Sequence, residues 1–361
     1  MEIYRRYGVI FAIVLVAIIA TACGKKEEGT VAPKVETAKP LDLSGGAKAL
    51  QPADVTNAAT TIRQNAIPAV TAGDYVIDGE KRYNGWFLSA ERIVFKANSK
   101  LVFSKDALAA RPNFFILAKE IVAEDSQQPG SITWERPSIA APPDSGAAQA
   151  GADNGAQESI KGGNGESGKQ GNAGQSGRDG PSLTITSLSV KGAVNVDVKG
   201  QDGGPGGKGQ YGGRGGGGGH GTPASQSAFD CKRGAGDGGA GGKGGDGGKG
   251  GPSGSGGRGG TFTLITSDDN MAAASRLLRV DVAGGQPGSV PGAGGDPGAG
   301  GSGGARGQEA KPWCKDDGRT GGTLGAGQPG QRGDLGAPGT SGDYFVGGMT
   351  PGSVTELLTK R

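Results

Sequence analysis

The residues that could perform acid–base chemistry are few and scattered. His220 is the chain's one histidine, and it lies in a glycine tract where no motif places a serine or cysteine nucleophile. Two pairs of adjacent acids, Asp268–Asp269 and Asp316–Asp317, lie in expected turns, where solvated loop carboxylates are the simpler interpretation. A general base must lie within hydrogen-bond reach of the proton that it removes, and no motif places these side chains beside a nucleophile. The sequence therefore predicts no catalytic residue and a protein that is not an enzyme.

Metal, cofactor and nucleic-acid sites are not expected either. The chain has no CxxC spacing and no GK[ST] phosphate loop. The segment GGDGGKGG at 244–251 lacks the aliphatic position of the calcium-binding nonapeptide. The formal net charge of +3 comes from interspersed acids and bases, which is too small a bias to indicate a nucleic-acid partner.

The N-terminal residues carry the sharpest signal. Arg5 and Arg6 precede an apolar run at 8–20 that is short for a membrane span but suits the hydrophobic region of a signal peptide. The run ends in ATAC, which closely resembles the lipobox of bacterial lipoproteins. The resemblance implies cleavage before Cys23 and lipidation of its thiol. A signal peptide with a chance cysteine and a single membrane anchor are the alternatives.

The residues that follow Cys23 indicate where the chain is sorted. They are Gly24, Lys25 and Lys26 rather than an aspartate. In Gram-negative lipoproteins this pattern resembles outer-membrane sorting. The resemblance implies a bacterial outer-membrane lipoprotein, lipid-anchored and either surface-exposed or facing the periplasm. Its lipid chains would make the membrane its first partner.

The other two cysteines, Cys231 and Cys314, form an even pair of thiols in what would be an oxidising compartment. That arrangement predicts a disulfide between them, and a two-cysteine metal site is the rival.

The central and C-terminal parts contain short apolar runs such as RIVF at 92–95 and SITW at 131–134. Each run has strand length, is rich in β-branched and aromatic residues and is bounded by turn residues, and no helical period of useful length appears. Repetition of this unit predicts a mainly-β fold, a short right-handed parallel β-helix-like solenoid without substantial α-helix beyond the signal peptide. An irregular β-sandwich is the alternative.

Glycine recurs at every third position in tracts that span 162–180, 200–221, 236–260, 285–307 and 325–342. A disordered linker has no reason to keep this period, which leaves one face bare on a polyproline II-type helix with three residues per turn. Collagen needs the same glycine, but the tracts are short, the whole chain has 20 prolines, and the middle tracts often carry a second glycine per triplet. An inner helix of a bundle needs that second bare face. The sequence therefore predicts a single-chain bundle and a monomeric body.

The order of the tracts predicts two long hairpins inserted into the solenoid. The tips of these hairpins are the only segments in them without the glycine period. Their sequences are TPASQSAFDCKR and QEAKPWCKDDGRT, and each contains one of the two paired cysteines. Hairpins of similar length place their tips together, so a disulfide there would staple the bundle.

The glycine-rich part resembles two kinds of known protein. Snow flea antifreeze proteins are glycine-rich single chains folded as bundles of polyproline II helices with disulfides. Receptor-binding tip adhesins of T-even-like phages carry a sandwich of polyglycine-type helices with recognition loops at the tips. The lipid anchor and the interleaved β-islands belong to neither family. The resemblance rests on composition and period and implies a bundle that presents loops.

These observations predict the following division of the chain. It comprises a signal peptide at 1–22, a flexible tether at 23–60, solenoid strands at 61–140, glycine tracts at 141–342 with β-islands at 182–200 and 260–285, and C-terminal strands or a cap at 343–361.

The predicted role is structural or adhesive, with a surface glycan or a protein as the ligand at the hairpin tips. Candidate ligand contacts are Trp313 at one tip and a ridge on one tract formed by Lys208, Tyr211, Arg214 and His220. Packing of Trp313 over the disulfide is the alternative for that residue. A polysaccharide-active β-helix enzyme and a collagen-like trimeric stalk are the alternative functions.

Overall fold

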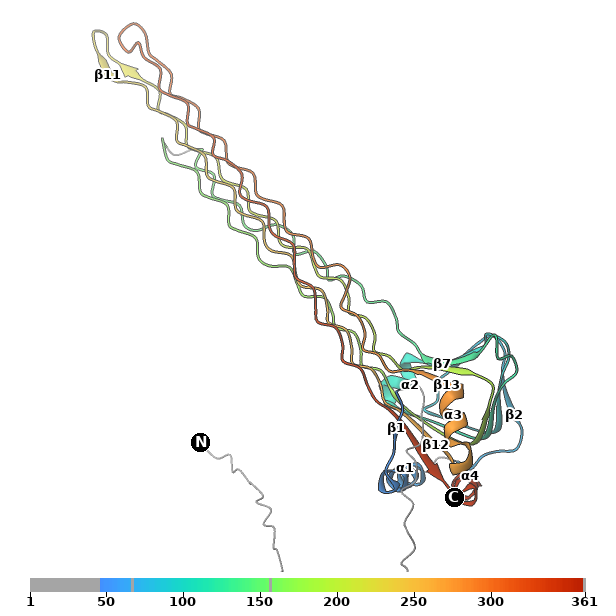
Figure 1. The fold of residues 1–361 in the computed structure, drawn as a ribbon. Helices are drawn as coiled ribbons and strands as arrows, with labels where there is room; N and C mark the ends of the chain where they lie inside the picture. Colours follow the sequence, from blue (N-terminus) through green and yellow to red (C-terminus); the bar gives the residue numbers. More distant parts are fainter. Residues whose placement is uncertain (1–45, 66–67, 156–157, 360–361) are drawn as a thin grey trace, which may run out of the picture. The chain divides into compact units, whose positions relative to one another are not determined.

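The computed structural model describes residues 46–65, 68–155 and 158–359. The expected signal peptide, the lipidation site Cys23 and most of the expected tether lie outside these residues and stay predictions. Residues Leu41–Arg361 form one compact unit. In it, a two-sheet solenoid continues into a bundle of glycine-rich tracts (Figure 1).

The solenoid consists of two sheets in which every strand pair is parallel. Sheet A has seven strands in the order β1-β14-β12-β8-β6-β4-β2, and sheet B has five in the order β13-β9-β7-β5-β3. From β2 to β9 the chain alternates between the sheets, so each coil contributes one strand to each. The predicted mainly-β fold with parallel strands is confirmed, and the right-handed sense of the coil stays a prediction.

The strands of sheet A are β1 (Lys48–Ala49), β2 (Asp74–Ile77), β4 (Phe87–Phe95), β6 (Asn113–Ala123), β8 (Ser182–Lys191), β12 (Phe262–Ser267) and β14 (Tyr344–Met349). Those of sheet B are β3 (Glu80–Tyr83), β5 (Lys100–Phe103), β7 (Gly130–Trp134), β9 (Val194–Asp197) and β13 (Leu278–Asp281).

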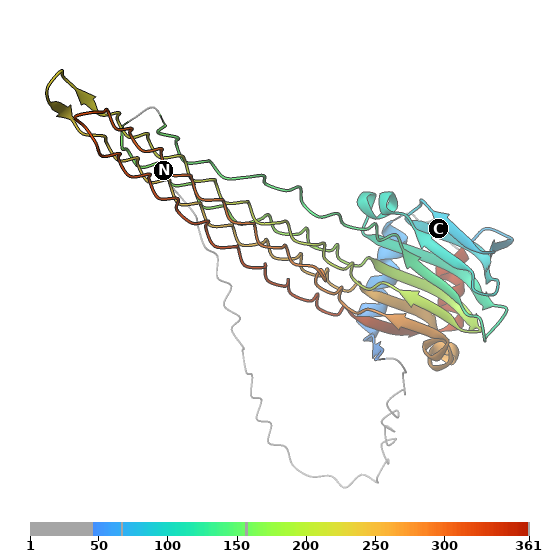
Figure 2. The ribbon, with the colours of Figure 1, turned by 90° about the horizontal axis from the view of Figure 1, so that it is seen from above.

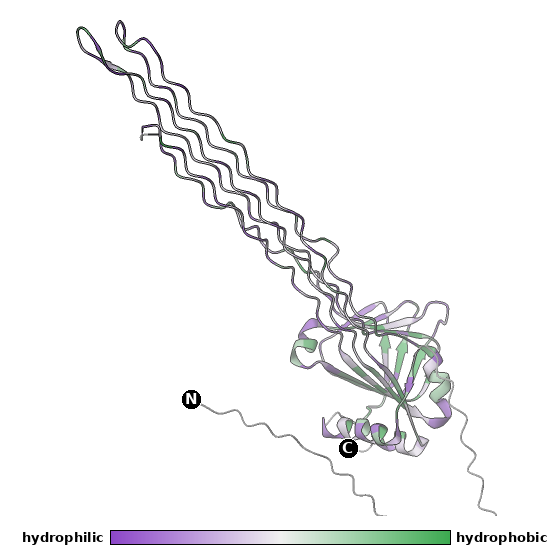
Figure 3. Ribbon diagram, turned by 60° about the vertical axis from the view of Figure 1, so that its left-hand side comes forward, coloured by the Kyte–Doolittle hydropathy of each residue, from purple (hydrophilic) through white to green (hydrophobic). Residues whose placement is uncertain are grey.

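The main core lies between the two sheets, where alternate side chains of each strand point inward. Phe103 of sheet B and Phe114 of sheet A stack with their ring centroids 4.2 Å apart. Phe95 and Phe262 are likewise fully buried. Figure 3 shows that the hydrophobic residues gather in these strands and their covering helices, whereas the bundle has few. The fold therefore buries its apolar surface almost entirely in the solenoid.

Helices cover the outer face of sheet A, and sequence analysis did not predict them. Helix α1 (Pro52–Gln64) begins within the expected tether, and α4 (Pro351–Thr359) contains the VTELL segment expected to be a strand. Val55, Ala59 and Ile62 are spaced by four and three residues, so they share the buried face of α1. The polar composition of this segment hid that period. The ordered body therefore starts before residue 60.

Two further helices, α2 (Lys105–Ala110) and α3 (Met271–Leu277), are short connections between strands, and a 3₁₀ turn, η1 (Asp268–Asn270), precedes α3. Met271, Ala274 and Leu277 of α3 pack against the main core at the end of sheet B where β13 is the last strand. Among the described residues no helix is long and apolar enough to cross a membrane.

The bundle contains six extended tracts in the described residues, one more than sequence analysis identified. They are tract I (139–155), tract II (160–180), tract III (200–221), tract IV (236–260), tract V (283–307) and tract VI (318–342). Tract I was missed because its sequence is rich in alanine and proline and has no glycine period. The tracts thus form three hairpins, and Figures 1 and 2 show them side by side along the bundle.

The tracts form two layers, each of which continues one sheet. Outgoing tracts I, III and V leave from β7, β9 and β13 of sheet B, and returning tracts II, IV and VI enter β8, β12 and β14 of sheet A. In both layers the tracts keep the order of these strands. Neighbours within a layer are parallel, and neighbours across the layers are antiparallel. The sheets therefore set the arrangement of the bundle.

Hydrogen bonds between tracts repeat every three residues. In tract IV the amide of Gly247 donates to Gln328 of tract VI, and the amide of Gly248 donates to Gln210 of tract III. The same two bonds recur at Gly250 and Gly251. A three-residue period with lateral bonds is the behaviour expected of polyproline II-type helices whose backbone groups pair with neighbours instead of water.

The glycine period follows from how closely the backbones approach. A Cβ atom at Gly248 would lie 1.9 Å from the carbonyl oxygen of Lys169, and one at Gly247 would lie 1.9 Å from that of Gly295. No side chain fits at such a distance. Tracts III and IV each bond to four other tracts and carry two glycines in most triplets, whereas tract VI bonds to two tracts and has about one. The bonding pattern thus confirms tracts III and IV as inner and tract VI as outer. Tract V, expected to be inner, and tract II, expected to be outer, each bond to three tracts, so the expected difference between these two is not observed.

Two glutamines replace glycine in tract III where tract I lies beside it. Gln210 accepts a hydrogen bond from the amide of Lys169 in tract II and donates to the carbonyls of Ser145 and Ala147 on the tract I side. Gln201 accepts from Arg178 in the same way and donates to Pro137. These amide groups bridge three segments, so tract I is held by side chains as well as by backbone bonds.

Ser253 also breaks the glycine period, and its hydroxyl accepts a hydrogen bond from an amide that the neighbouring tract leaves without a carbonyl partner. Tract V has one extra residue between Gln286 and Val290, which interrupts its pairing with tract VI. The amide of Gly336 consequently has no carbonyl partner in tract V, and the buried Ser253 Oγ accepts its hydrogen bond at 2.9 Å. The exception to the repeat is therefore part of the bonding pattern.

Replacing Ser253 with glycine, the residue that the repeat favours, should destabilise the protein. The Gly336 amide loses its acceptor, and the expected loss is about 1–2 kcal/mol of unfolding free energy. Urea denaturation measures it. Ser255→Gly is the matched control, because Ser255 Oγ accepts from Ala337 near solvent and water can replace it. Equal stability of Ser253→Gly and the natural protein would contradict this assignment.

The buried Tyr344 predicts a loss of stability in alkali. Its hydroxyl has no hydrogen-bond partner among the described residues, and burial raises the pKa of Tyr344 to about 12. In the unfolded chain a tyrosine ionises near pH 10. The contribution of the neutral phenol is therefore complete below pH 10 and is lost as the pH rises towards 12.

Tyr344→Phe should remove this pH dependence without loss of stability at neutral pH, because no hydrogen bond is broken. Urea midpoints measured from pH 9 to pH 12 test this. Parallel curves for the two proteins would contradict the assignment to Tyr344.

Candidate functional site

The far end of the bundle is formed by two loops, 222–235 between tracts III and IV and 308–317 between tracts V and VI. The first contains a small antiparallel hairpin of β10 (Ser225–Gln226) and β11 (Cys231–Arg233) (Figure 1). A disulfide joins Cys231 to Cys314 across the two loops, with the Cα atoms 5.0 Å apart. The predicted disulfide is confirmed. We call these two loops the tip.

Side-chain hydrogen bonds hold the two loops together beside the disulfide. Gln226 accepts from the backbone amide of Trp313 at 3.0 Å and donates to the carbonyl of Lys311. The indole Nε1 of Trp313 donates to the carbonyl of Ala228 at 3.1 Å. The position of Trp313 is thus fixed by two bonds to the opposite loop.

Two aromatic side chains are nevertheless exposed at the tip. Phe229, in the turn of the hairpin, is 84% exposed, and Trp313 is 46% exposed. Trp313 therefore bonds to the opposite loop and still exposes part of its ring, and its use as a ligand contact stays a prediction. Phe229 was not among the expected contacts, although an aromatic residue in the polar segment SQSAFD was the available signal. Exposed aromatic side chains on cross-linked loops are typical of a recognition surface.

Some of the charges of the tip are paired. Lys311 lies 2.8 Å from Glu309, whose hydrogen bond raises the pKa of Lys311. Arg306 at the end of tract V pairs with Asp317 at 3.2 Å. These exposed pairs contribute little to stability. Their effect is that no strong field of one sign surrounds the aromatic rings.

The predicted ridge on tract III divides into engaged and free residues. Lys208 donates to the Tyr211 hydroxyl at 3.0 Å and to Asp296 of tract V at 3.2 Å, and these bonds raise the pKa of Lys208. His220 Nδ1 accepts from the amide of Ala305 at 3.2 Å, so its role is to join tracts III and V.

Arg214 is exposed and has no side-chain partner among the described residues. The ridge therefore contains one free charged group rather than a convergent site. Its use as a ligand contact stays a prediction.

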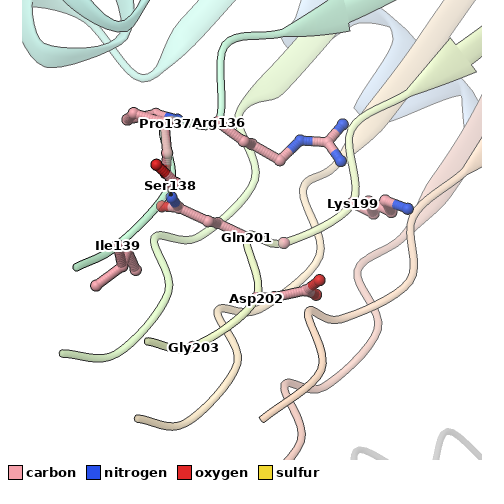
Figure 4. A pocket seen from close by; sticks show the side chains of 9 residues that line it. Arg136, Pro137, Ser138, Ile139, Lys199, Gln201, Asp202 and Gly203 are labelled. Carbon is pink, nitrogen blue, oxygen red and sulfur yellow. Dashed lines mark hydrogen bonds between the residues drawn. The ribbon is translucent and has the colours of Figure 1, made fainter. Parts of the chain in front are cut away.

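A cavity of about 310 Å³ lies where tracts I and III leave the solenoid (Figure 4). Arg136 on its wall donates to Thr133 and pairs with Asp197, and Asp202 accepts from the amide of Gln286 at 2.7 Å. Gln201 bonds to Pro137 across the cavity. Most polar groups here hold the first residues of the tracts in place. We therefore interpret the cavity as part of the structural junction between the solenoid and the bundle.

One outer region of sheet A carries several carboxylates, but each is paired with a base. Arg92 lies 3.3 Å from Glu120 and 3.5 Å from Asp74, and Lys119 lies 2.8 Å from Glu91. The hydrogen bond from Lys119 lowers the pKa of Glu91. A carboxyl group with a lowered pKa is ionised at neutral pH and is unsuited to donate a proton as a general acid. Within the described residues, no group of three metal-ligating side chains gathers.

Comparisons with known proteins give little further information. No family model and no curated protein matches the chain. Among solved structures it is similar to the nine-helix polyproline type II bundle of a springtail antifreeze protein from Granisotoma rainieri, at 24% identity over 54% of this chain and 93% of that chain, with a TM-score of 0.12. At that score the likeness carries no argument. The resemblance to bacterial lipoproteins stays a prediction.

Removing the disulfide should weaken the attachment of the tip. The bridge spans a sequence separation of 83 residues, and a loop of that size corresponds to about 4 kcal/mol in the chain-entropy estimate. Cys231→Ser/Cys314→Ser should therefore unfold at lower urea concentration than the oxidised protein. Added reductant should lower the midpoint of the natural protein and leave that of the double variant unchanged. Identical midpoints for both proteins would contradict a stabilising role.

Proposed function

We propose that this chain is a bacterial, exported, membrane-anchored lipoprotein with a non-catalytic adhesive role. In this proposal the solenoid and bundle hold a recognition tip away from the membrane to which Cys23 is attached. The single observation that carries the proposal is the pair of exposed aromatic residues, Phe229 and Trp313, fixed on a disulfide-linked tip. The sorting signals around Cys23 support the anchored and exported part.

The construction of the bundle supports a presenting role. Tract III runs from Gly200, beside the solenoid, to Gly221 at the tip, and at about 3.1 Å per residue this is about 65 Å. Lateral hydrogen bonds fix this length, since every tract bonds to at least two others. A flexible linker of the same length would let the tip fold back. The bundle therefore suits a spacer that keeps a small surface at a set distance.

The adhesive part of the proposal is tested with residues 41–361, which form a compact unit. Beads coated with this segment should bind bacterial surfaces or an immobilised glycan array, and Phe229→Ser/Trp313→Ser should reduce binding at least tenfold. Leu335→Ser is the matched control, because Leu335 is 63% exposed on tract VI and lies outside the tip. Equal binding by all three proteins, or none by the natural one, would contradict the proposal.

The anchoring part is tested separately by labelling with radioactive palmitate in a bacterial host. The full chain should incorporate label into the membrane fraction, and Cys23→Ser should not. Label in the Cys23→Ser chain, or none in either chain, would contradict the lipidation of Cys23.

A further inference from the structure

The polar groups at the centre of the tip are turned inward. Both ends of the Gln226 amide bond to the opposite loop, and the indole N–H of Trp313 bonds to Ala228. The Ser227 hydroxyl accepts from the amide of Phe229 and donates to the carbonyl of Asp230. The surface that remains for a ligand between these groups is the ring of Phe229, the exposed Pro312 and the open part of Trp313. These three side chains are apolar, and the exposed Asp230 follows Phe229 directly.

The tip projects instead of enclosing a space. Phe229 lies in the turn of the β10–β11 hairpin at the end of the bundle, and neighbouring chain covers only a small part of its ring. Small-molecule sites are concave and place several polar groups around the ligand. A projecting apolar surface needs either a partner with a pocket that receives the rings or a deformable layer into which the rings insert. The interfacial layer of a lipid bilayer is deformable in this way and favours phenylalanine and tryptophan.

The tip is electrically balanced. Its loops contain four acids, Asp230, Glu309, Asp316 and Asp317, and four bases, Lys232, Arg233, Lys311 and Lys315. Attraction to an anionic surface needs an excess of bases. Insertion of the aromatic rings would therefore be the dominant source of binding energy, and neither lipid charge nor salt should change it strongly.

We infer that the tip inserts Phe229 and Trp313 into the interfacial layer of a lipid bilayer. This inference rests on the proposed function and names the surface to which the tip adheres. With Cys23 anchored in one membrane, a tip of this kind would join that membrane to a second bilayer, or to another part of the same one.

The test uses residues 41–361 with vesicles of phosphatidylcholine and vesicles that also contain phosphatidylglycerol. The natural segment should co-sediment with both kinds to a similar extent, in low and high salt. Replacing Phe229 or Trp313 with serine should weaken binding about tenfold for each ring. Leu335→Ser should bind like the natural segment. Because Phe229 is almost fully exposed, its substitution leaves the fold intact.

Tryptophan fluorescence gives a second readout of the insertion. Lipids brominated near the headgroup should quench part of the emission of the natural segment, and Trp313→Phe should abolish that part. The other two tryptophans, Trp86 and Trp134, pack in the solenoid cores, and their combined emission serves as an internal reference.

The outcomes separate the inference from the proposed function. Absence of vesicle binding, together with binding to cells or glycans that depends on the tip, would overturn the bilayer inference and leave the adhesive function standing, with a protein socket or a glycan as the ligand. Vesicle binding only when phosphatidylglycerol is present, and lost in salt, would also overturn it, because a charged contact would then be responsible. Absence of every kind of tip-dependent binding would overturn both.

Discussion

The lateral hydrogen bond between glycine-rich backbones is the interaction on which the rest of this structure depends. It requires two tracts to approach so closely that no Cβ atom fits between them, since a Cβ atom placed on Gly248 would lie 1.9 Å from the carbonyl oxygen of Lys169. A tract with neighbours on more sides needs more bare positions in the triplet, and tracts III and IV, which bond to four tracts each, are the richest in glycine. Glycine content does not give the exact number of neighbours, since tracts II and V differ in glycine and each bond to three tracts.

This interaction is too weak to organise the bundle by itself. Ordering a residue's backbone costs about 1–2 kcal/mol, and glycine lies at the expensive end, whereas a hydrogen bond returns about 0.5–1.5 kcal/mol net. The solenoid compensates at one end by fixing the order and spacing of six chain segments with a hydrophobic core. The disulfide between Cys231 and Cys314 joins two of the three hairpins at the other end. The bundle is therefore held at both ends, and the function proposed for the tip depends on both.

Much of this arrangement could be predicted from the sequence because it follows from strict periods. The three-residue glycine period predicted the tracts, and the repetition of short runs rich in β-branched and aromatic residues predicted parallel strands. What could not be predicted lacked a period. Tract I needs little bare surface as an outer tract, so nothing in its alanine- and proline-rich sequence distinguishes it from a linker. Helix α1 was concealed because Val55, Ala59 and Ile62 are few and stand among polar residues.

At the candidate site, too, features without a sequence period could not be predicted. Pairing of the cysteines and the position of Trp313 followed from the hairpin order, but the exposure of Phe229 depends on which way a short turn points. In the expected ridge on tract III, Lys208, Tyr211 and His220 proved to be engaged, and Arg214 has no side-chain partner among the described residues. The three-residue spacing places His220 on the ridge of tract III. It cannot show that the His220 ring accepts a hydrogen bond from the amide of Ala305.

Residue-resolved hydrogen exchange in tract IV would test the central claim most directly. If tracts pair laterally within one chain, two amides in each triplet are bonded, so Gly247 and Gly248 should be protected. Lys249, whose amide has no backbone partner in the described part of the chain, should exchange quickly. The same pattern should recur at the following glycine pair. One protected amide per triplet would indicate a collagen-like trimer, and uniform rapid exchange would indicate a disordered linker, and either result would contradict the account.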